Sequence, residues 1–138
     1  MSEFIGESGL LSISSNPHDV EQLLTGLEDL LAKSCLDEMS AFHLRCAIIE
    51  VVNNCIQHAY LNKPGQPIRI SYQLDDDRVQ IVVSDKGQAF LEPIETSETD
   101  PMSESGRGLK IIRAWVTKLR FERRDEWNVC ELEQKIPS

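Results

Sequence analysis

The chain has 138 residues, of which 41% are hydrophobic and 27% are charged, and it carries a formal net charge of -9 with a pI near 4.8. This length and composition predict one soluble globular domain that buries about two-thirds of the surface of its unfolded chain. The acidic balance disfavours binding to nucleic acids and anionic membranes, which relies on concentrated Lys and Arg, whereas a basic partner protein is electrostatically easier.

The four cysteines, Cys35, Cys46, Cys55 and Cys130, form no CxxC pair. We expect them to be reduced and mostly packed, as in a cytoplasmic protein. No basic-then-apolar leader opens the chain, and no apolar run approaches the length of a membrane span. Secretion and membrane insertion are therefore not expected.

The first predicted elements are a strand from about Leu10 to Ser14 and an amphipathic helix. Asn16, Pro17 and Asp19 have the order of a helix start: a capping side chain, a proline in the first position and an acid in the first turn. Apolar residues then recur at helical spacing: Val20, Leu23, Leu24, Leu27, Leu30 and Leu31. This pattern predicts a helix that covers a sheet or a partner.

A second helix is predicted from Ser40 to Tyr60, with apolar residues around most of its circumference. Glu50, Asn54 and His58 interrupt that surface at intervals of four residues and so form one polar line. Burying a carboxylate and an amide without partners costs several kcal/mol. Either neighbouring backbone satisfies them, or they face a ligand such as nucleotide-bound Mg²⁺, which prefers oxygen donors. A single histidine such as His58 is more often a structural hydrogen bonder.

Alternating apolar residues predict two strands, Ile68 to Leu74 and Val79 to Ser84, which form an antiparallel hairpin that leads into Asp85-Lys86-Gly87. The segment from Gln88 to Ser105 is acidic and rich in Pro, Ser and Thr. Segments this long without regular structure are usually functional lids or disordered loops.

Gly106-Arg107-Gly108 introduces a third helix, and two strands close the chain, Lys118 to Arg123 and Asn128 to Ile136. These elements predict a single domain over residues 1–138, with its core at about residues 10–136. The fold class is α+β, with two layers: a mixed, mostly antiparallel sheet and helices on one face.

Three local features each have an ordinary explanation. Asp-Lys-Gly after a strand is usually a turn, Gly-Arg-Gly before a helix is usually a start signal, and a polar line can be satisfied internally. Glycines at a helix start can also aim backbone amides at a phosphate. The three features together, in this order and with a long acidic segment between the last two, are far less ordinary.

This order resembles that of the GHKL, or Bergerat-fold, ATPases, the superfamily of gyrase-type topoisomerases, heat-shock chaperones and sensor histidine kinases. The matching motifs are Glu50-Val51-Val52-Asn53-Asn54 with His58-Ala59-Tyr60, then Val83-Ser84-Asp85-Lys86-Gly87, then Gly106-Arg107-Gly108-Leu109. Within the superfamily, the chain is most similar to the small bacterial anti-sigma-factor serine kinases of the RsbW and SpoIIAB group. The resemblance runs from about Leu10 to Ile136 and implies the Bergerat two-layer fold.

The resemblance implies a role for each matching position on the helix and the first glycine motif. Asn54 would bind Mg²⁺ together with phosphate oxygens and water. Glu50 would orient or deprotonate the attacking hydroxyl group. Asp85 would accept a hydrogen bond from the adenine amino group of ATP, and Gly87 would let the backbone approach the base.

At the second glycine motif, Gly106, Gly108 and the amides around Leu109 would hold the phosphates. Arg107 faces either the γ-phosphate or solvent. The segment from Gln88 to Ser105 would be the ATP lid. One departure is Cys130, which stands where relatives often place a threonine near the adenine; a thiol is a weaker hydrogen bonder, which can change nucleotide affinity.

The implied function is that of a protein serine kinase with ATP and Mg²⁺ as cofactors. It would sequester a sigma factor and phosphorylate a serine of a STAS-domain anti-anti-sigma antagonist. Two alternatives stay open: a non-catalytic sequestering module, and a switch kinase that acts on a STAS protein without binding sigma. A homodimer is expected from the family, whereas direct nucleic-acid and membrane contacts are not. A sensor histidine kinase, a topoisomerase and a chaperone are disfavoured because each needs further domains.

Overall fold

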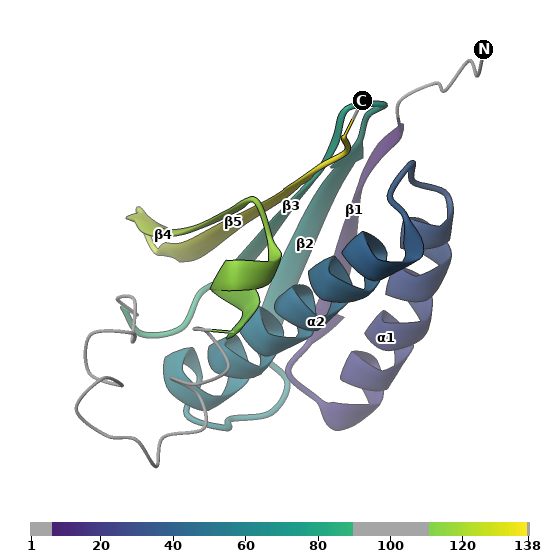
Figure 1. Cartoon of the computed structure of the whole chain (residues 1–138). Coiled ribbons are helices and arrows are strands. Elements are labelled where there is room, and N and C mark those ends of the chain that lie inside the picture. The colour runs from purple at the N-terminus through teal and green to yellow at the C-terminus, as the bar shows by residue number, and fades with distance from the viewer. Residues whose placement is uncertain (1–6, 90–110, 138) are drawn as a thin grey trace.

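The computed structural model describes residues 7–89 and 111–137, which form a sheet with helices on one face (Figure 1). The elements in chain order are β1 (Glu7–Ser14), α1 (Pro17–Ala32), α2 (Glu38–Asn54), the π-helix η1 (Cys55–Ala59), β2 (Pro67–Leu74), β3 (Arg78–Asp85), β4 (Lys118–Arg124) and β5 (Trp127–Lys135). Residues 111–115 are also helical and lie beside α2 (Figure 1). None of the helices in these ranges is long and apolar enough to span a membrane.

The five strands form one sheet in the order β1-β2-β3-β5-β4. The α+β class, both hairpins and the helices on one face are confirmed. Every pairing between these strands is antiparallel, so the described sheet is not mixed. The chain reverses direction three times between these strands, before α1, between α1 and α2, and after α2, so β2 enters the sheet antiparallel to β1 (Figure 1).

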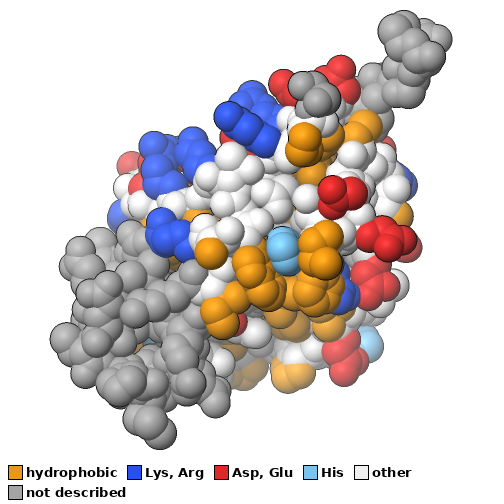
Figure 2. All heavy atoms as spheres, in the orientation of Figure 1, with side chains coloured by type: hydrophobic (Ala, Val, Ile, Leu, Met, Phe, Trp, Pro, Cys, Tyr) orange, Lys and Arg blue, Asp and Glu red, His pale blue; other side chains and the backbone are white. Residues whose placement is uncertain are grey.

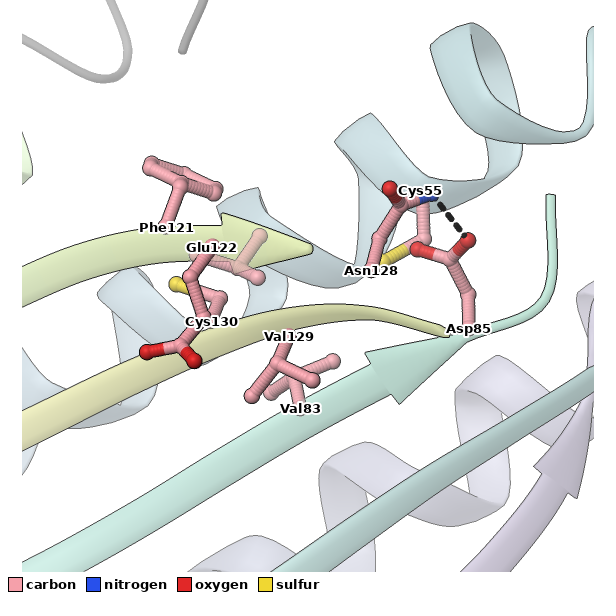
Figure 3. A pocket seen from close by; sticks show the side chains of 9 residues that line it. Cys55, Val83, Asp85, Phe121, Glu122, Asn128, Val129 and Cys130 are labelled. Atoms are coloured by element: carbon pink, nitrogen blue, oxygen red, sulfur yellow. Dashed lines mark hydrogen bonds between the residues drawn. The ribbon is translucent and has the colours of Figure 1, made fainter. Parts of the chain in front are cut away.

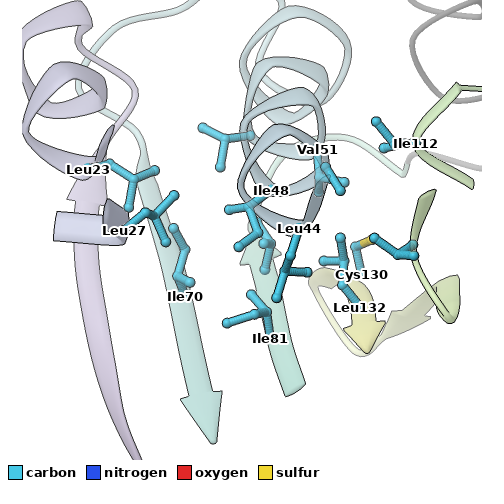
Figure 4. Packing of buried hydrophobic residues seen from close by; sticks show 14 of the residues in the cluster. Leu23, Leu27, Leu44, Ile48, Val51, Ile70, Ile81, Ile112, Cys130 and Leu132 are labelled. Atoms are coloured by element: carbon cyan, nitrogen blue, oxygen red, sulfur yellow. The ribbon is translucent and has the colours of Figure 1, made fainter. Parts of the chain in front are cut away.

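The core lies between the two layers. Its fully buried side chains include Leu27 of α1, Leu44 and Ile48 of α2, Ile70 of β2 and Ile81 of β3 (Figure 4). Burial alternates along β3, and Asp85 is the last residue on its helix-facing side. The same alternation that fills the core thus places a carboxylate at the end of the strand, under the helices.

Helix α1 begins where the sequence predicts, but the capping differs. Asn16 is the N-cap residue and Pro17 follows it, yet the Asn16 side chain forms no capping hydrogen bond. Its Oδ1 accepts a hydrogen bond of 2.9 Å from the backbone N–H of Gly65. The side chain therefore ties the start of α1 to the loop before β2.

Helix α2 differs from its prediction at both ends. It begins at Glu38 because the side chain of Asp37 caps it, accepting a hydrogen bond of 2.7 Å from the N–H of Ser40. The prediction of one helix running to Tyr60 was wrong, because α2 ends at Asn54 and a π-helix follows. The wider turns of a π-helix displace His58 from the line of Glu50 and Asn54, and such segments are frequent at functional sites.

Candidate functional site

The side chain of Asn54, the last residue of α2, is the most unusual polar group in the core. Asn54 is 1% exposed, and within residues 7–89 and 111–137 neither its Oδ1 nor its Nδ2 has a hydrogen-bond partner. Leaving a buried amide unpaired costs about 1–3 kcal/mol. Among the described residues, the backbone does not satisfy this group, so it remains available to a ligand with complementary chemistry.

Glu50 lies one helical turn before Asn54 on the same side of α2. Its side chain is only partly exposed. Burial raises the pKa of the Glu50 carboxyl above its ordinary value. A carboxylate with a raised pKa is a better proton acceptor near neutral pH than an exposed one.

Asp85, 2% exposed at the end of β3, is fixed by hydrogen bonds to one of its two oxygens. Its Oδ1 accepts a hydrogen bond of 2.8 Å from the backbone N–H of Gly87. It accepts a second one, also of 2.8 Å, from Nδ2 of Asn128 (Figure 3). Asn128 is the residue directly opposite Asp85 in the pairing of β3 with β5. These two donors set the orientation of the carboxylate.

Asn128 is a site residue that the sequence did not reveal. Its Nδ2 also donates to the carbonyl of Gln88 at 2.8 Å, and its Oδ1 accepts a hydrogen bond of 3.0 Å from Arg123. Arg123 donates from the same nitrogen to the carbonyl of Gly87 at 3.1 Å. The network fixes the Asn128 amide so that its NH₂ group faces Asp85.

Cys130, the residue expected near the adenine, lies two positions further along β5, opposite Val83. It belongs to a pocket between α2 and the strands β3, β4 and β5, lined by Val51, Cys55, Val83, Asp85, Phe121, Glu122, Asn128, Val129 and Cys130 (Figure 3). Burial raises the pKa of the Cys55 and Cys130 thiols. The Asp85 carboxylate, which accepts a hydrogen bond from Cys55, raises the pKa of the Cys55 thiol further. Both thiols are therefore neutral, and the pocket is a mostly apolar slot with the Asp85 carboxylate at one end and Glu122 also in its lining.

Gly87 packs against the end of η1. A Cβ atom at this position would overlap the carbonyl group of Ala59. The next residue, Gln88, donates from its backbone to Ala59 O and from its side chain to His58 O, both at 2.9 Å. Gly87 thus contacts the π-helix through Ala59. That its backbone also lies close to a bound adenine base stays a prediction.

The structure therefore brings Asp85 and Gly87 against the segment that follows Asn54, with Glu50 one turn away. Four predicted site residues, Gly106, Arg107, Gly108 and Leu109, lie outside the described residues, as does nearly all of the predicted lid.

The protein-family model of the histidine kinase-like ATPase domain matches residues 13–133 of this chain. This chain belongs to that family. The resemblance inferred from the motifs is thereby confirmed, and the antiparallel sheet with helices on one face is the fold expected of a histidine kinase-like ATPase.

Curated relatives of this histidine kinase-like ATPase include the serine-protein kinase RsbW of Bacillus pumilus, 30% identical over 90 residues, which are 57% of this chain and 56% of RsbW. The serine/threonine-protein kinase BtrW of Bordetella bronchiseptica is 28% identical over 125 residues, or 86% of this chain and 87% of BtrW. An anti-sigma F factor of Clostridium botulinum is 31% identical over 97 residues, 66% of each chain. The match to RsbW thus spans little more than half of that relative.

Two solved structures show the same fold. The RsbU and RsbW domains of Rv1364c from Mycobacterium tuberculosis align with a TM-score of 0.68 and 19% identity, covering 96% of this chain and 34% of that one. The catalytic domain of the histidine kinase ThkA aligns with a TM-score of 0.56 and 17% identity, covering 94% and 95%. At these identities the likeness concerns the fold of the ATPase domain alone.

We predict that Gly87→Ala destabilises this histidine kinase-like ATPase by about 1–3 kcal/mol, because the added methyl group must displace the backbone of η1. Urea unfolding of the purified variant measures the loss. Gly26→Ala is the matched control, because a Cβ at Gly26, inside α1, meets nothing within 4 Å. That control should stabilise the protein by about 0.5–1 kcal/mol. Equal effects of the two substitutions would contradict the contact with Ala59.

We also predict that Asn128→Asp lowers stability at neutral pH and that stability partly recovers as the pH falls. The substitution keeps the shape of the side chain but places a second carboxylate opposite Asp85, and protonation of the pair relieves the repulsion. Unfolding measured between acidic and neutral pH tests this. A loss that stays constant across that range would mean that packing, rather than the hydrogen bond to Asp85, is what Asn128 contributes.

Proposed function

We propose that this chain is an ATP-binding protein serine kinase that also sequesters a sigma factor. The names of its relatives, serine-protein kinase and anti-sigma F factor, support this class of activity. The observation that carries the proposal is the unpaired buried amide of Asn54, one turn from the half-buried carboxylate of Glu50.

Asp85 would recognise the base. Its Oδ1 is engaged by Gly87 and Asn128, and its carboxylate closes one end of a slot lined by Val51, Val83 and Cys130. Among the described residues this slot has room for little more than one water molecule, so the base would lie at its mouth and direct an amino group toward the Asp85 carboxylate. Adenine has that donor, whereas guanine presents a carbonyl group at the equivalent edge.

Asn54 would hold Mg²⁺ through its amide oxygen. The fit rests on chemistry: a hard cation takes carbonyl oxygens as ligands and leaves its other positions to water and phosphate. When bound, the ion would neutralise charge on the triphosphate. Gly106, Gly108 and the amides near Leu109 would hold the phosphates at a helix start, and Arg107 would lie beside them or in solvent.

Glu50 would act on the attacking serine. Its carboxylate accepts the hydroxyl proton, the hydroxyl oxygen forms a bond to the γ-phosphorus, and ADP leaves with the electrons of the broken bond. Positioning and charge neutralisation supply most of the acceleration in phosphoryl transfer. The pKa of Glu50, raised by burial, makes this proton transfer more favourable.

The proposed substrate is a serine of a STAS-domain antagonist of the sigma factor, and the proposed assembly is a homodimer in the cytoplasm. Incubation with γ-labelled ATP, Mg²⁺ and a purified STAS protein tests the kinase activity, with the phosphoserine located by mass spectrometry. The absence of phosphoserine from a protein that binds ATP would leave the sequestering module as the function. Phosphorylation without co-purification of a sigma factor would identify a switch kinase instead.

A further inference from the structure

The helix layer carries a groove between the end of α1 and the start of α2, and it shares no lining residue with the pocket at Asp85. Leu31 and Leu36 contribute the apolar lining, and the small side chains of Ala32 and Ala41 leave the groove open. Phe42 lines the groove as well and is 47% exposed. The groove is therefore accessible and partly apolar, and Glu28, Glu38 and Arg45 complete its lining.

A partly exposed aromatic cluster, formed by Phe42, His43 and Trp115, adjoins the groove. The rings of His43 and Trp115 are stacked with centroids 4.4 Å apart, and the Phe42 ring lies 6.3 Å from that of Trp115. Figure 2 shows hydrophobic side chains gathered around a histidine on this face. Ordered aromatic side chains at a surface are typical anchors of protein interfaces.

The charges around the groove are acidic on balance. Residues 28–45, which include all the lining residues, contain four carboxylates, Glu28, Asp29, Asp37 and Glu38, and two Lys or Arg residues, Lys33 and Arg45. Both cations are already paired, Lys33 with Glu7 at 3.8 Å and Arg45 with Glu28 at 2.7 Å. Glu38, which lines the groove, has no ion-pair partner among residues 7–89 and 111–137. In Figure 2, acidic side chains border this face on the side of the helices, and Lys and Arg lie over β4 and β5.

We propose that the groove and the aromatic cluster dock a basic amphipathic helix of a partner protein. A groove between two helices accepts a third helix through apolar residues at i, i+3 or i+4, and i+7. The carboxylates along the groove select Lys and Arg beside that apolar stripe and increase the rate of association. The inference uses no residue of the nucleotide pocket, so it can be tested independently of the kinase activity.

A library of helical peptides displayed on phage and selected on the intact protein tests the proposal. We expect the enriched peptides to carry an apolar stripe flanked by Lys or Arg. We also expect their affinity to fall at least about tenfold for Ala32→Arg, which places a cation in the groove. Ala32 is exposed at the end of α1, where arginine favours helix stability. Thr25→Arg is the matched control, because it adds the same charge to an exposed position of α1 outside the groove, and it should leave binding unchanged.

Three results would overturn the proposal. The first is no enrichment above a selection without the protein. The second is enrichment of peptides that are acidic or that bind Ala32→Arg as tightly as the wild type. The third is a wild-type dimer that Ala32→Arg dissociates in sedimentation experiments, because the groove would then be covered by a second copy of this chain.

Discussion

Asn54→Leu is expected to abolish binding of Mg·ATP and to stabilise the nucleotide-free protein by about 1–3 kcal/mol. Leucine has the same branched skeleton as asparagine but lacks the buried amide, whose oxygen and nitrogen have no partner among the described residues. If Asn54 contributed to folding rather than to ligand binding, Asn54→Leu would lower the stability of the nucleotide-free protein instead of raising it. Urea unfolding without nucleotide and calorimetric titration with Mg·ATP measure the two effects.

Asn53→Leu is the matched control for this substitution. Asn53 precedes Asn54 on α2, and its side chain points about 100° away around the helix axis. It is partly exposed rather than buried. We expect the control to keep nucleotide binding and to change stability by less than about 0.5 kcal/mol. If Asn54→Leu lost more than about 1 kcal/mol of stability, the amide would have a structural partner after all.

Glu50→Gln is expected to lower phosphoryl transfer by about 10²–10⁴-fold while nucleotide binding is retained, because the amide cannot accept the serine proton. Transfer from γ-labelled ATP to a STAS protein measures the rate, and calorimetry measures the binding. Glu21→Gln, an exposed substitution on α1, is the control and should have the wild-type rate. A Glu50→Gln variant with the wild-type rate would assign the proton transfer to another group.

The raised pKa of Glu50 fixes the sign of a pH effect on stability. The folded protein holds the Glu50 proton more tightly than the unfolded chain, so stability falls as the pH rises from the ordinary glutamate pKa through the raised pKa. Glu50→Gln removes this dependence and should be more stable than the wild type at neutral pH. The transfer rate of the wild type should rise over the same window, because the carboxylate form is the base.

The sequence predicted the elements well because their signals are local. The alternation of apolar residues in Val79 to Ser84 indicates a strand with one buried face. The spacing of Leu23, Leu27 and Leu30 indicates a helix with one face packed against the core. The position of Asp85 under the helices followed from that alternation. Glu50 and Asn54 could be placed on one helix face for the same reason.

The features that the sequence did not predict depend on contacts between distant segments. Asn128 meets Asp85 only because β5 pairs with β3, and pairing between hairpins leaves no local pattern. The π-helix was missed because residues 55–59 have the sequence of an ordinary helix. The carbonyl groups of His58 and Ala59 accept hydrogen bonds from Gln88, which follows β3 and is distant in sequence. The α1–α2 groove was also missed, since exposed aromatics at helical spacing look like core residues.

The central claim is that the buried Asn54 amide exists to hold a magnesium-bound nucleotide, and calorimetric titration of the wild type and Asn54→Leu with Mg·ATP tests it most directly. We predict saturable binding to the wild type, weaker binding when Mg²⁺ is chelated, and no measurable heat for Asn54→Leu. Equal affinity of a folded Asn54→Leu variant for Mg·ATP, or no binding by the intact wild type at millimolar ligand, would contradict the claim.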